Sequence, residues 1–372
     1  MVPCPELTEC SCDETSIHCH SSGTVNTRLN QQFFDELYAF IGPTTTHLTV
    51  SGGNITKLKR NMFGKCKGDP SKRLHLTDVV LRNNNIRTIH RKAFYCIPYL
   101  KHLDLSLNSW SMDEGNIFAV FSKIPNLQKL ILTNSIKRSD FGYLSSAFHD
   151  THMETLTELY LGENNIWTFA SDMSSTVCKV ATNLQILDLH SNNLAKLVLD
   201  PCFSNMLNMQ LLNLSDNSFN RVTLTTIRMF DQLHERNVNF TVDLRGNQWA
   251  CDCNIVDFKN WLMKTNVNVV DRQNMTCLDG HHFGRNLWDI SPNDLVCVDS
   301  TVQTNTGFIV ISILFAVIGI VVVVVCNITV FRYLGKLGNT KQSQFSLLFE
   351  TMSATIAIGL DKDKGLKFST LT

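Results

Sequence analysis

The stretch LQILDLHSNNL, residues 184–194, carries apolar side chains at its positions 1, 4, 6 and 11 and an asparagine at position 9. Side chains alternate along a strand, so Leu187 and Leu189 point to one face while positions 3, 5 and 7 point to the other. Asn192, at position 9, leaves the strand in a turn, where a buried amide must find hydrogen-bond partners on neighbouring backbone. The stretch therefore predicts a short strand that buries one edge.

The same pattern recurs seven more times, with starts 24 to 31 residues apart. These copies begin at Thr45, Leu76, Leu100, Leu127, Leu156, Met209 and Asn239. The copy from Leu127 is one residue short before its Asn134, and the asparagine slot elsewhere holds Asn84, Asn108, Asn164, Asn192, Asn217 and Asn247. This signature is typical of leucine-rich repeats, whose coils stack because none of them buries its apolar edge alone. We therefore expect an α/β fold, a curved leucine-rich repeat solenoid (horseshoe) over residues 45–249, with a spine of Phe63, Phe94, Phe118, Phe203 and Phe230 under its convex side.

Cysteines gather at both ends of the repeats, where a solenoid exposes its core unless it is capped. One group precedes the first copy and the other follows the last: Cys4, Cys10, Cys12 and Cys19, then Cys251, Cys253, Cys277 and Cys297. We expect disulfide-bonded caps over residues 1–44 and 250–299. The spacing leaves three pairings open for each group, and zinc with His18 and His20 is the alternative to disulfides.

Four more cysteines lie in adjacent coils and favour two further bridges. Cys66 and Cys96 occupy similar places in the first two coils, and Cys178 and Cys202 do so in the fifth and sixth. Neighbouring coils bring such positions within disulfide reach, and free buried cysteines are the alternative. This leaves Cys326, which we interpret as a small apolar residue, with palmitoylation as the alternative.

Residues 307–331 contain no charged side chain, and about 20 such residues suffice to cross a bilayer. Arg332, Lys336 and Lys341 follow this span, and basic residues mark the cytoplasmic side. We expect a single-pass type I protein of the plasma membrane, with extracellular repeats, a stalk at 300–306, a lipid-embedded helix at 307–331 and a tail at 332–372. The chain opens on MVPCPE without an apolar signal segment, so we expect a processed or incomplete N-terminus.

The positions of the glycosylation sequons and the net charge give further indications of the kind of protein. Sequons on the predicted outer side begin at Asn54, Asn213, Asn239 and Asn274. A fifth, at Asn327, lies in the predicted span and should stay bare. The formal net charge is +0, which gives no electrostatic support for nucleic-acid binding.

Several details resemble the trophoblast-glycoprotein family of extracellular leucine-rich repeat membrane proteins. They are WACDC at 249–253, NWL at 260–262, NDLVC at 293–297 and the irregular LILTNSI at 130–136. The resemblance implies first-to-third and second-to-fourth pairing in each cap, that is, Cys4–Cys12 and Cys10–Cys19, then Cys251–Cys277 and Cys253–Cys297. It also implies a cell-surface glycoprotein that acts in adhesion and restrains Wnt signalling.

Most outward positions on the predicted concave face are polar, but Ile131, Tyr160, Ile186 and Leu211 form a diagonal apolar stripe about 20 Å long. Exposed apolar patches mark interfaces, and tyrosine is a favoured anchor, whereas scattered exposed apolar residues are the ordinary alternative. We take the stripe, with Asp188 beside it, as the candidate site for an extracellular or membrane protein ligand.

The sequence offers no enzymatic or cofactor site. Asp104, Asp188 and Asp243 share position 5, but three coils separate the first two by about 14 Å, which is too far for paired acid–base work. No phosphate loop, nucleophile elbow or zinc-protease helix is present. The alternatives to a trophoblast-glycoprotein-like binder are a Toll-like or co-receptor pattern-recognition ectodomain and a neuronal leucine-rich repeat adhesion protein.

Overall fold

The computed structural model describes residues 2–4, 7–21, 29–67, 69–111, 118–136, 143–151, 153–169, 171–295, 318–319, 321–322, 324–325, 328–329 and 332. The chain divides into two compact units, Met1–Cys297 and Val298–Thr372. Among the residues described in both units, no helix is long and apolar enough to cross a membrane. Most of the predicted span at 307–331 lies outside the described residues, as do the stalk, Cys326, Asn327 and all of the tail except Arg332.

A twelve-stranded sheet runs through the first unit, and each of the eight copies supplies one strand to it. These strands pair in parallel and without register shifts. They are β4 His47–Ser51, β6 Asp78–Val80, β8 His102–Asp104, β9 Lys129–Ile131, β10 Glu158–Tyr160, β11 Ile186–Asp188, β12 Leu211–Asn213 and β13 Thr241–Asp243.

Cap strands close both ends of this sheet. Before the repeats come β1 Val2–Cys4, β2 Leu7–Cys12 and β3 Ser16–His20, in which β2 pairs antiparallel with its two neighbours. After them, β15 Asn268–Val269 extends the parallel sheet beyond β13. Two pairs of short strands lie outside it: β5 Lys57–Leu58 with β7 Thr88–Ile89, and β14 Trp249–Ala250 with β16 Cys277–Asp279.

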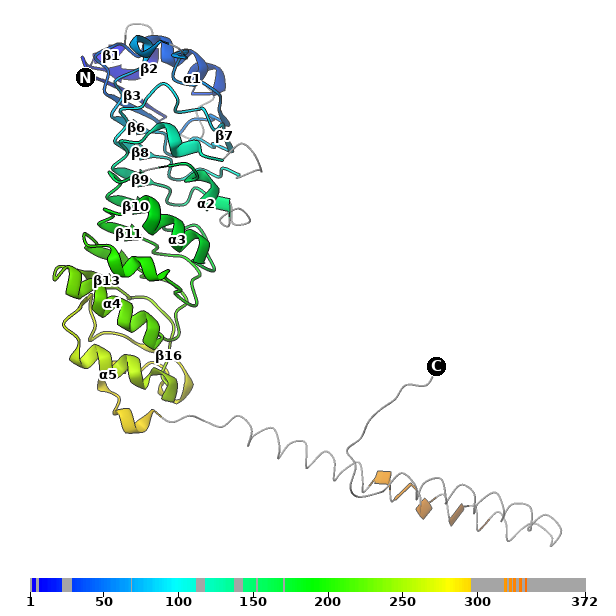
Figure 1. Ribbon diagram of the computed structural model, residues 1–372. Coiled ribbons are helices and arrows are strands. Elements are labelled where there is room, and N and C mark those ends of the chain that lie inside the picture. The colour runs from blue at the N-terminus through cyan, green and yellow to red at the C-terminus, as the bar shows by residue number, and fades with distance from the viewer. Residues whose placement is uncertain are drawn as a thin grey trace. The chain divides into compact units, whose positions relative to one another are not determined.

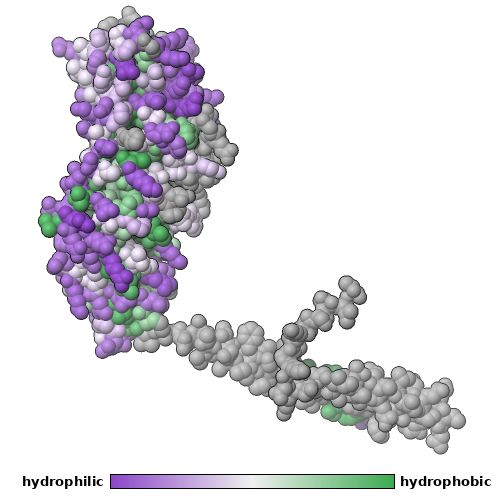
Figure 2. All heavy atoms as spheres, in the orientation of Figure 1, coloured by the Kyte–Doolittle hydropathy of each residue, from purple (hydrophilic) through white to green (hydrophobic). Residues whose placement is uncertain are grey.

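Helices fill the return path of several coils and also occur in both caps. They are α1 Gln31–Leu37 in the N-terminal cap, α2 Leu144–Ala147, α3 Ser171–Val180 and α4 Leu224–Arg236 in the coils, and α5 Val256–Lys264 in the C-terminal cap. Figure 1 shows β6, β8, β9, β10 and β11 stacked along one side of the first unit, with α2 and α3 on the other. The view in Figure 2 is mainly hydrophilic, with hydrophobic patches between the polar side chains.

The core lies between the strands and the return segments. Leu187 and Leu189 are fully buried, as the alternation along the strand predicts. Phe63, Phe94, Phe203 and Phe230 are buried in the spine. The prediction for Phe118 is wrong: it is exposed and its ring lies 4.2 Å from that of His149, while Phe121 enters the core in its place.

The position-9 asparagines form a buried ladder that joins each coil to the next. The Oδ1 atom of Asn164 accepts from the backbone N–H groups of Ser135 and Ile136, in the preceding coil, at 2.9 Å. Its Nδ2 atom donates to the carbonyl oxygens of Leu132, Leu161 and Gly162. Asn84, Asn108, Asn192, Asn217 and Asn247 bond in the same way. The ladder satisfies the backbone that the strands leave unpaired as they turn away.

The fourth copy is complete, contrary to the prediction that it is one residue short before Asn134. Ser135 occupies its position 9, fully buried, and its hydroxyl donates to the carbonyl of Leu132. The same oxygen accepts from Nε1 of Trp110 at 3.3 Å. Asn134 instead takes a left-handed turn conformation with a φ of 48°. The serine continues the ladder with one donor where an asparagine has two.

Replacing Asn164 with alanine should lower the free energy of unfolding by about 3 kcal/mol or more. The substitution leaves two buried N–H groups and several buried carbonyl groups without the hydrogen bonds that the amide supplies. Asn208→Ala is the matched control, since its exposed amide donates to another side chain, Asn183, and should change stability by less than about 0.5 kcal/mol. Denaturant unfolding of residues 1–297, secreted behind a signal peptide, measures both. Equal stabilities of the two variants would contradict the role given to the ladder.

Candidate partner-binding surface

The outward side chains of β4 to β13 form the surface that we call the sheet face. The parallel register places them in two rows that run across the strands. The position-3 row is His47, Asp78, His102, Lys129, Glu158, Ile186, Leu211 and Thr241, and the position-5 row is Thr49, Val80, Asp104, Ile131, Tyr160, Asp188, Asn213 and Asp243. Charged and imidazole groups dominate the N-terminal half of the position-3 row, and aliphatic groups follow them.

The four residues of the predicted stripe lie on four consecutive strands. Ile131 pairs with Tyr160 across β9 and β10, and Ile186 pairs with Leu211 across β11 and β12. All four side chains are half-buried. The two pairs are offset by one row, so Tyr160 faces Ile186 diagonally. Sequence reasoning missed Val80, a half-buried apolar residue of the position-5 row that is separated from Ile131 by Asp104.

Tyr160 is held in place by its neighbours. Its hydroxyl donates to Oε2 of Glu158 at 2.8 Å, and Nζ of Lys129 lies 4.9 Å from the centre of its ring. Lys129 also forms an ion pair of 2.7 Å with Glu158. Tyr160 therefore also contributes to the stability of its own repeat, because it is half-buried and hydrogen-bonded.

Electrostatics in this cluster follow from the same contacts. Burial alone would raise the pKa of Glu158, but hydrogen bonds from Lys129 and Tyr160 and the charge of Lys129 outweigh it and lower that pKa below 4.5. The hydrogen bond with Glu158 raises the pKa of Lys129. Burial, and then the hydrogen bond to Glu158, raises the pKa of Tyr160. The tyrosine is therefore a neutral ring between two fixed charges.

Asp188, next to the stripe, is only 7% exposed. Its Oδ1 atom accepts from the backbone N–H of His190 at 3.0 Å and lies 2.8 Å from the Nδ1 atom of that imidazole. The ring covers Gly162, where a Cβ atom would lie 2.3 Å from Cε1 of His190. Asp188 thus holds the imidazole of His190 in place, and the imidazole is the more exposed of the two groups.

The other position-5 carboxylates also have local partners. Asp104 accepts from the backbone N–H of Ser106, and Asp243 accepts from Nε and Nη2 of Arg245. Each bond runs two residues along its own coil, which favours a structural role over acid–base chemistry.

A second polar group lies at the N-terminal end of the sheet face. Asp78 stands between His47, at 3.3 Å, and His102, and it accepts from the hydroxyl of Thr77 at 2.6 Å. Burial would raise the pKa of Asp78, but hydrogen bonds from Thr77 and His102 and the charges of both histidines lower it. This group bounds the stripe with polar, already paired side chains.

The structure joins Cys4 to Cys12, Cys10 to Cys19, Cys66 to Cys96, Cys178 to Cys202 and Cys251 to Cys277. Cys253 is also disulfide-bonded, while Cys297, its expected partner, lies outside the described residues. One cluster of potential metal ligands is found in the part of the chain that the structure describes, at Cys178, Asp200 and Cys202. The Cys178–Cys202 disulfide occupies both of its sulfur atoms.

The four sequons differ in accessibility. Asn239 and Asn274 are exposed, and Asn54 is half-buried with its Oδ1 accepting from Asn85. Asn213 lies on the sheet face, two residues after Leu211, and its Oδ1 accepts from the backbone N–H and the hydroxyl of Ser215. A glycan on Asn213 would therefore stand at the C-terminal end of the stripe.

Comparison with known proteins agrees with this architecture. Leucine-rich repeat family models match residues 74–135 and 183–206. Mouse trophoblast glycoprotein is 26% identical over 343 residues, which span 87% of this chain and 75% of that protein. The zebrafish transforming growth factor beta activator LRRC33 is 28% identical over 63% of this chain and 35% of its own length. The crystal structure of human 5T4, or trophoblast glycoprotein, has a TM-score of 0.62 at 23% identity and covers 78% of this chain and 97% of that one.

Glu158 generates a prediction for the effect of pH on stability. Because its pKa is lowered in the folded state, its stabilising contribution is complete above the ordinary value of 4.5 and disappears as the pH falls through the folded value. The difference in unfolding free energy between wild type and Glu158→Gln should therefore be constant from neutral pH to about 4.5 and shrink below it. Denaturant unfolding at a series of pH values measures it. Glu235→Gln is the control, because Glu235 has no ion pair among the described residues, and the same pH profile for both variants would disprove the assignment.

Proposed function

We propose that this leucine-rich repeat protein, which resembles trophoblast glycoprotein, is a single-pass type I cell-surface glycoprotein that binds a protein partner through its sheet face. The observation that carries the proposal is the alignment of Ile131, Tyr160, Ile186 and Leu211 on β9 to β12. Half-buried apolar side chains around a fixed tyrosine, with charged groups at the edge, are the composition that protein interfaces favour. Extracellular and membrane proteins are the expected partners.

The membrane part of the proposal rests on the sequence. Residues 307–331 are uncharged and long enough to span a bilayer, and Arg332, Lys336 and Lys341 follow them. The cysteine-rich caps suit an oxidising, extracellular compartment. We therefore assign residues 1–44, 45–249 and 250–299 to the extracellular side, residues 300–306 to a stalk and residues 332–372 to a cytoplasmic tail.

Restraint of Wnt signalling, together with adhesion, is the cellular role that we propose. It rests on the resemblance to trophoblast glycoprotein over 87% of the chain and on the description of the human structure as Wnt-activated inhibitory factor 1. A Wnt-responsive transcription reporter should fall when the full chain is expressed and recover with the Tyr160→Ala variant. An unchanged reporter with surface-expressed wild type would remove this role and leave the binding proposal standing.

Tyr160→Ala should weaken partner binding about thirtyfold, because truncation of an interface anchor costs upward of about 2 kcal/mol. Tyr160→Phe should bind more nearly like wild type, since it keeps the ring and loses only the hydrogen bond to Glu158. Cell-surface crosslinking to wild type followed by mass spectrometry identifies the partner, and titration compares the variants.

Thr49→Ala, three strands before the stripe begins, is the control and should bind normally. Tyr160→Ala loses one hydrogen bond, worth about 1 kcal/mol, and the packing of a half-buried ring, so thermal unfolding must confirm that this variant is folded at the assay temperature. Equal affinity of wild type and a folded Tyr160→Ala would exclude the stripe as the binding site.

The orientation in the membrane has its own test. An antibody against the repeats should stain intact cells that express the chain behind a signal peptide, whereas an antibody against residues 332–372 should stain them only after permeabilisation. The reverse pattern would overturn the type I assignment, because the basic residues would then lie outside.

A further inference from the structure

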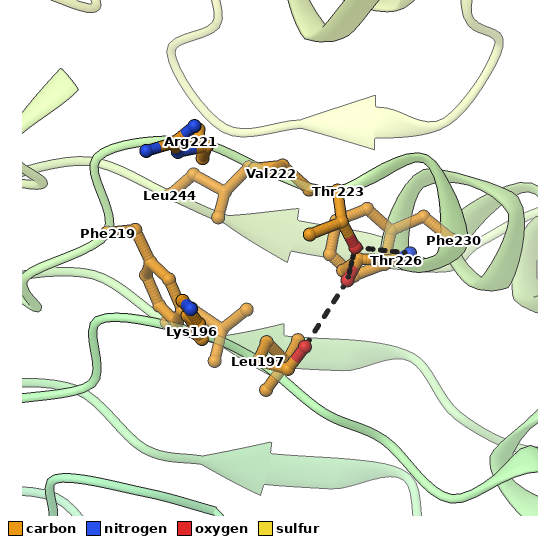
Figure 3. Close-up of a pocket in the computed structure, with 10 residues that line it drawn as sticks. Lys196, Leu197, Phe219, Arg221, Val222, Thr223, Thr226, Phe230 and Leu244 are labelled. Carbon is orange, nitrogen blue, oxygen red and sulfur yellow. Dashed lines mark hydrogen bonds between the residues drawn. The ribbon is translucent and has the colours of Figure 1, made fainter. Parts of the chain in front are cut away.

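A cavity of about 330 Å³ opens between the last coils of the repeat region, behind the sheet. Its apolar lining comes from the ends of two strands, the turns that follow them and α4: Leu197, Leu214, Phe219, Val222, Phe230 and Leu244. Figure 3 labels all of these side chains except Leu214 and shows Lys196 and Arg221 on the same side as Phe219 and away from Phe230. The volume falls within the range of small-molecule sites, which are mostly apolar with a few polar groups.

The polar groups inside the cavity are already paired. The hydroxyl of Thr226 donates to the carbonyl of Leu197 at 3.3 Å, and it lies 3.0 Å from the hydroxyl of Thr223. Thr223 also caps α4 by accepting from the backbone N–H of Thr226. These bonds, drawn as dashed lines in Figure 3, leave the inner wall with little to offer a polar ligand. An apolar group gains most by filling such a cavity, because water finds too few partners there.

Two basic side chains, Lys196 and Arg221, also line the cavity. Lys196 and Arg221 are exposed, and neither forms an ion pair or a hydrogen bond within the described part of the chain. Lys196 comes from the segment after β11 and Arg221 from the equivalent segment after β12, so the two cations belong to neighbouring coils and both line the cavity. An unpaired lysine and arginine together favour an anion, and the guanidinium matches a carboxylate or phosphate in two-point contact.

We propose that this cavity binds a small amphipathic anion, with its alkyl chain among Leu214, Val222 and Phe230 and its carboxylate at Lys196 and Arg221. The site is separate from the proposed protein interface, because Leu214 and Leu244 are buried behind the sheet, whereas the stripe lies on its outer face. Each further pair of methylene groups that fits should tighten binding about tenfold. The inference is independent of the proposed function.

Photoaffinity labelling of the full chain in cell membranes tests the site. The probes are a decanoic acid that carries a diazirine and the matching decyl alcohol. Mass spectrometry should find the acid probe on peptides between residues 197 and 230, and excess decanoate should compete with it. In Lys196→Gln/Arg221→Gln, labelling of these peptides by the acid should fall about tenfold while labelling by the alcohol is unchanged, because two exposed charge contacts together account for a loss of that order.

The control, Lys179→Gln/Arg228→Gln, removes two exposed cations of α3 and α4 that do not line the cavity, and it should label like wild type. Val222→Phe fills the cavity and should reduce labelling by both probes; if it fails to reach the cell surface, the charge variants decide. Absence of competed labelling between residues 197 and 230 in wild type would overturn the site. An equal response of acid and alcohol to the loss of Lys196 and Arg221 would overturn its preference for anions.

Discussion

The amide of a buried asparagine is the constraint on which each coil depends. Most strands of the sheet contain three residues, and strands this short do not fix their own register. Asn164 supplies what they lack, because its acceptor binds two N–H groups of the coil before and its donors bind carbonyls of both coils. With the register fixed, the inward leucines of neighbouring strands lie opposite one another in the core. The same alignment places the outward side chains in the two rows of the sheet face. The arrangement of the proposed partner-binding surface therefore depends on hydrogen bonds that the asparagines form at the ends of the strands.

The sequence predicts the strands well because their pattern is local and repeats eight times. It predicts the return segments poorly, because the spacing between copies varies from 24 to 31 residues. The spine phenylalanine therefore does not lie at a fixed number of residues from the start of each copy. Phe118 is the example: the side chain that enters the core is Phe121, three residues later. Ser135 shows the same limit at the ladder. The residue type suggests that Asn134 occupies position 9, but the backbone turns at Asn134 and places Ser135 in that position.

The candidate site also has features that the sequence predicts and features that only the structure shows. Position in the repeat is enough to bring Ile131, Tyr160, Ile186 and Leu211 to one face. The bonds of Glu158 to Lys129 and Tyr160 need the register between coils, which no single copy contains. A partly exposed ion pair such as Lys129–Glu158 contributes about 1 kcal/mol or less to stability, so the main effect of this cluster is to hold the tyrosine ring in one orientation. A ring that is already ordered loses less entropy when a partner covers it, which leaves more of the contact energy for affinity.

The size of a partner's footprint follows from what borders the stripe. On the N-terminal side, Asp78 is already paired with His47 and His102, so covering it removes water from charges and offers them no new bond. On the C-terminal side, Asn213 holds its Oδ1 against Ser215 and leaves Nδ2 for a glycan, which would block access beyond β12. Between these borders lie β9 to β12, a width of about 20 Å at the usual strand spacing. A compact element, such as one helix or hairpin of the partner, fits this width better than a broad flat surface.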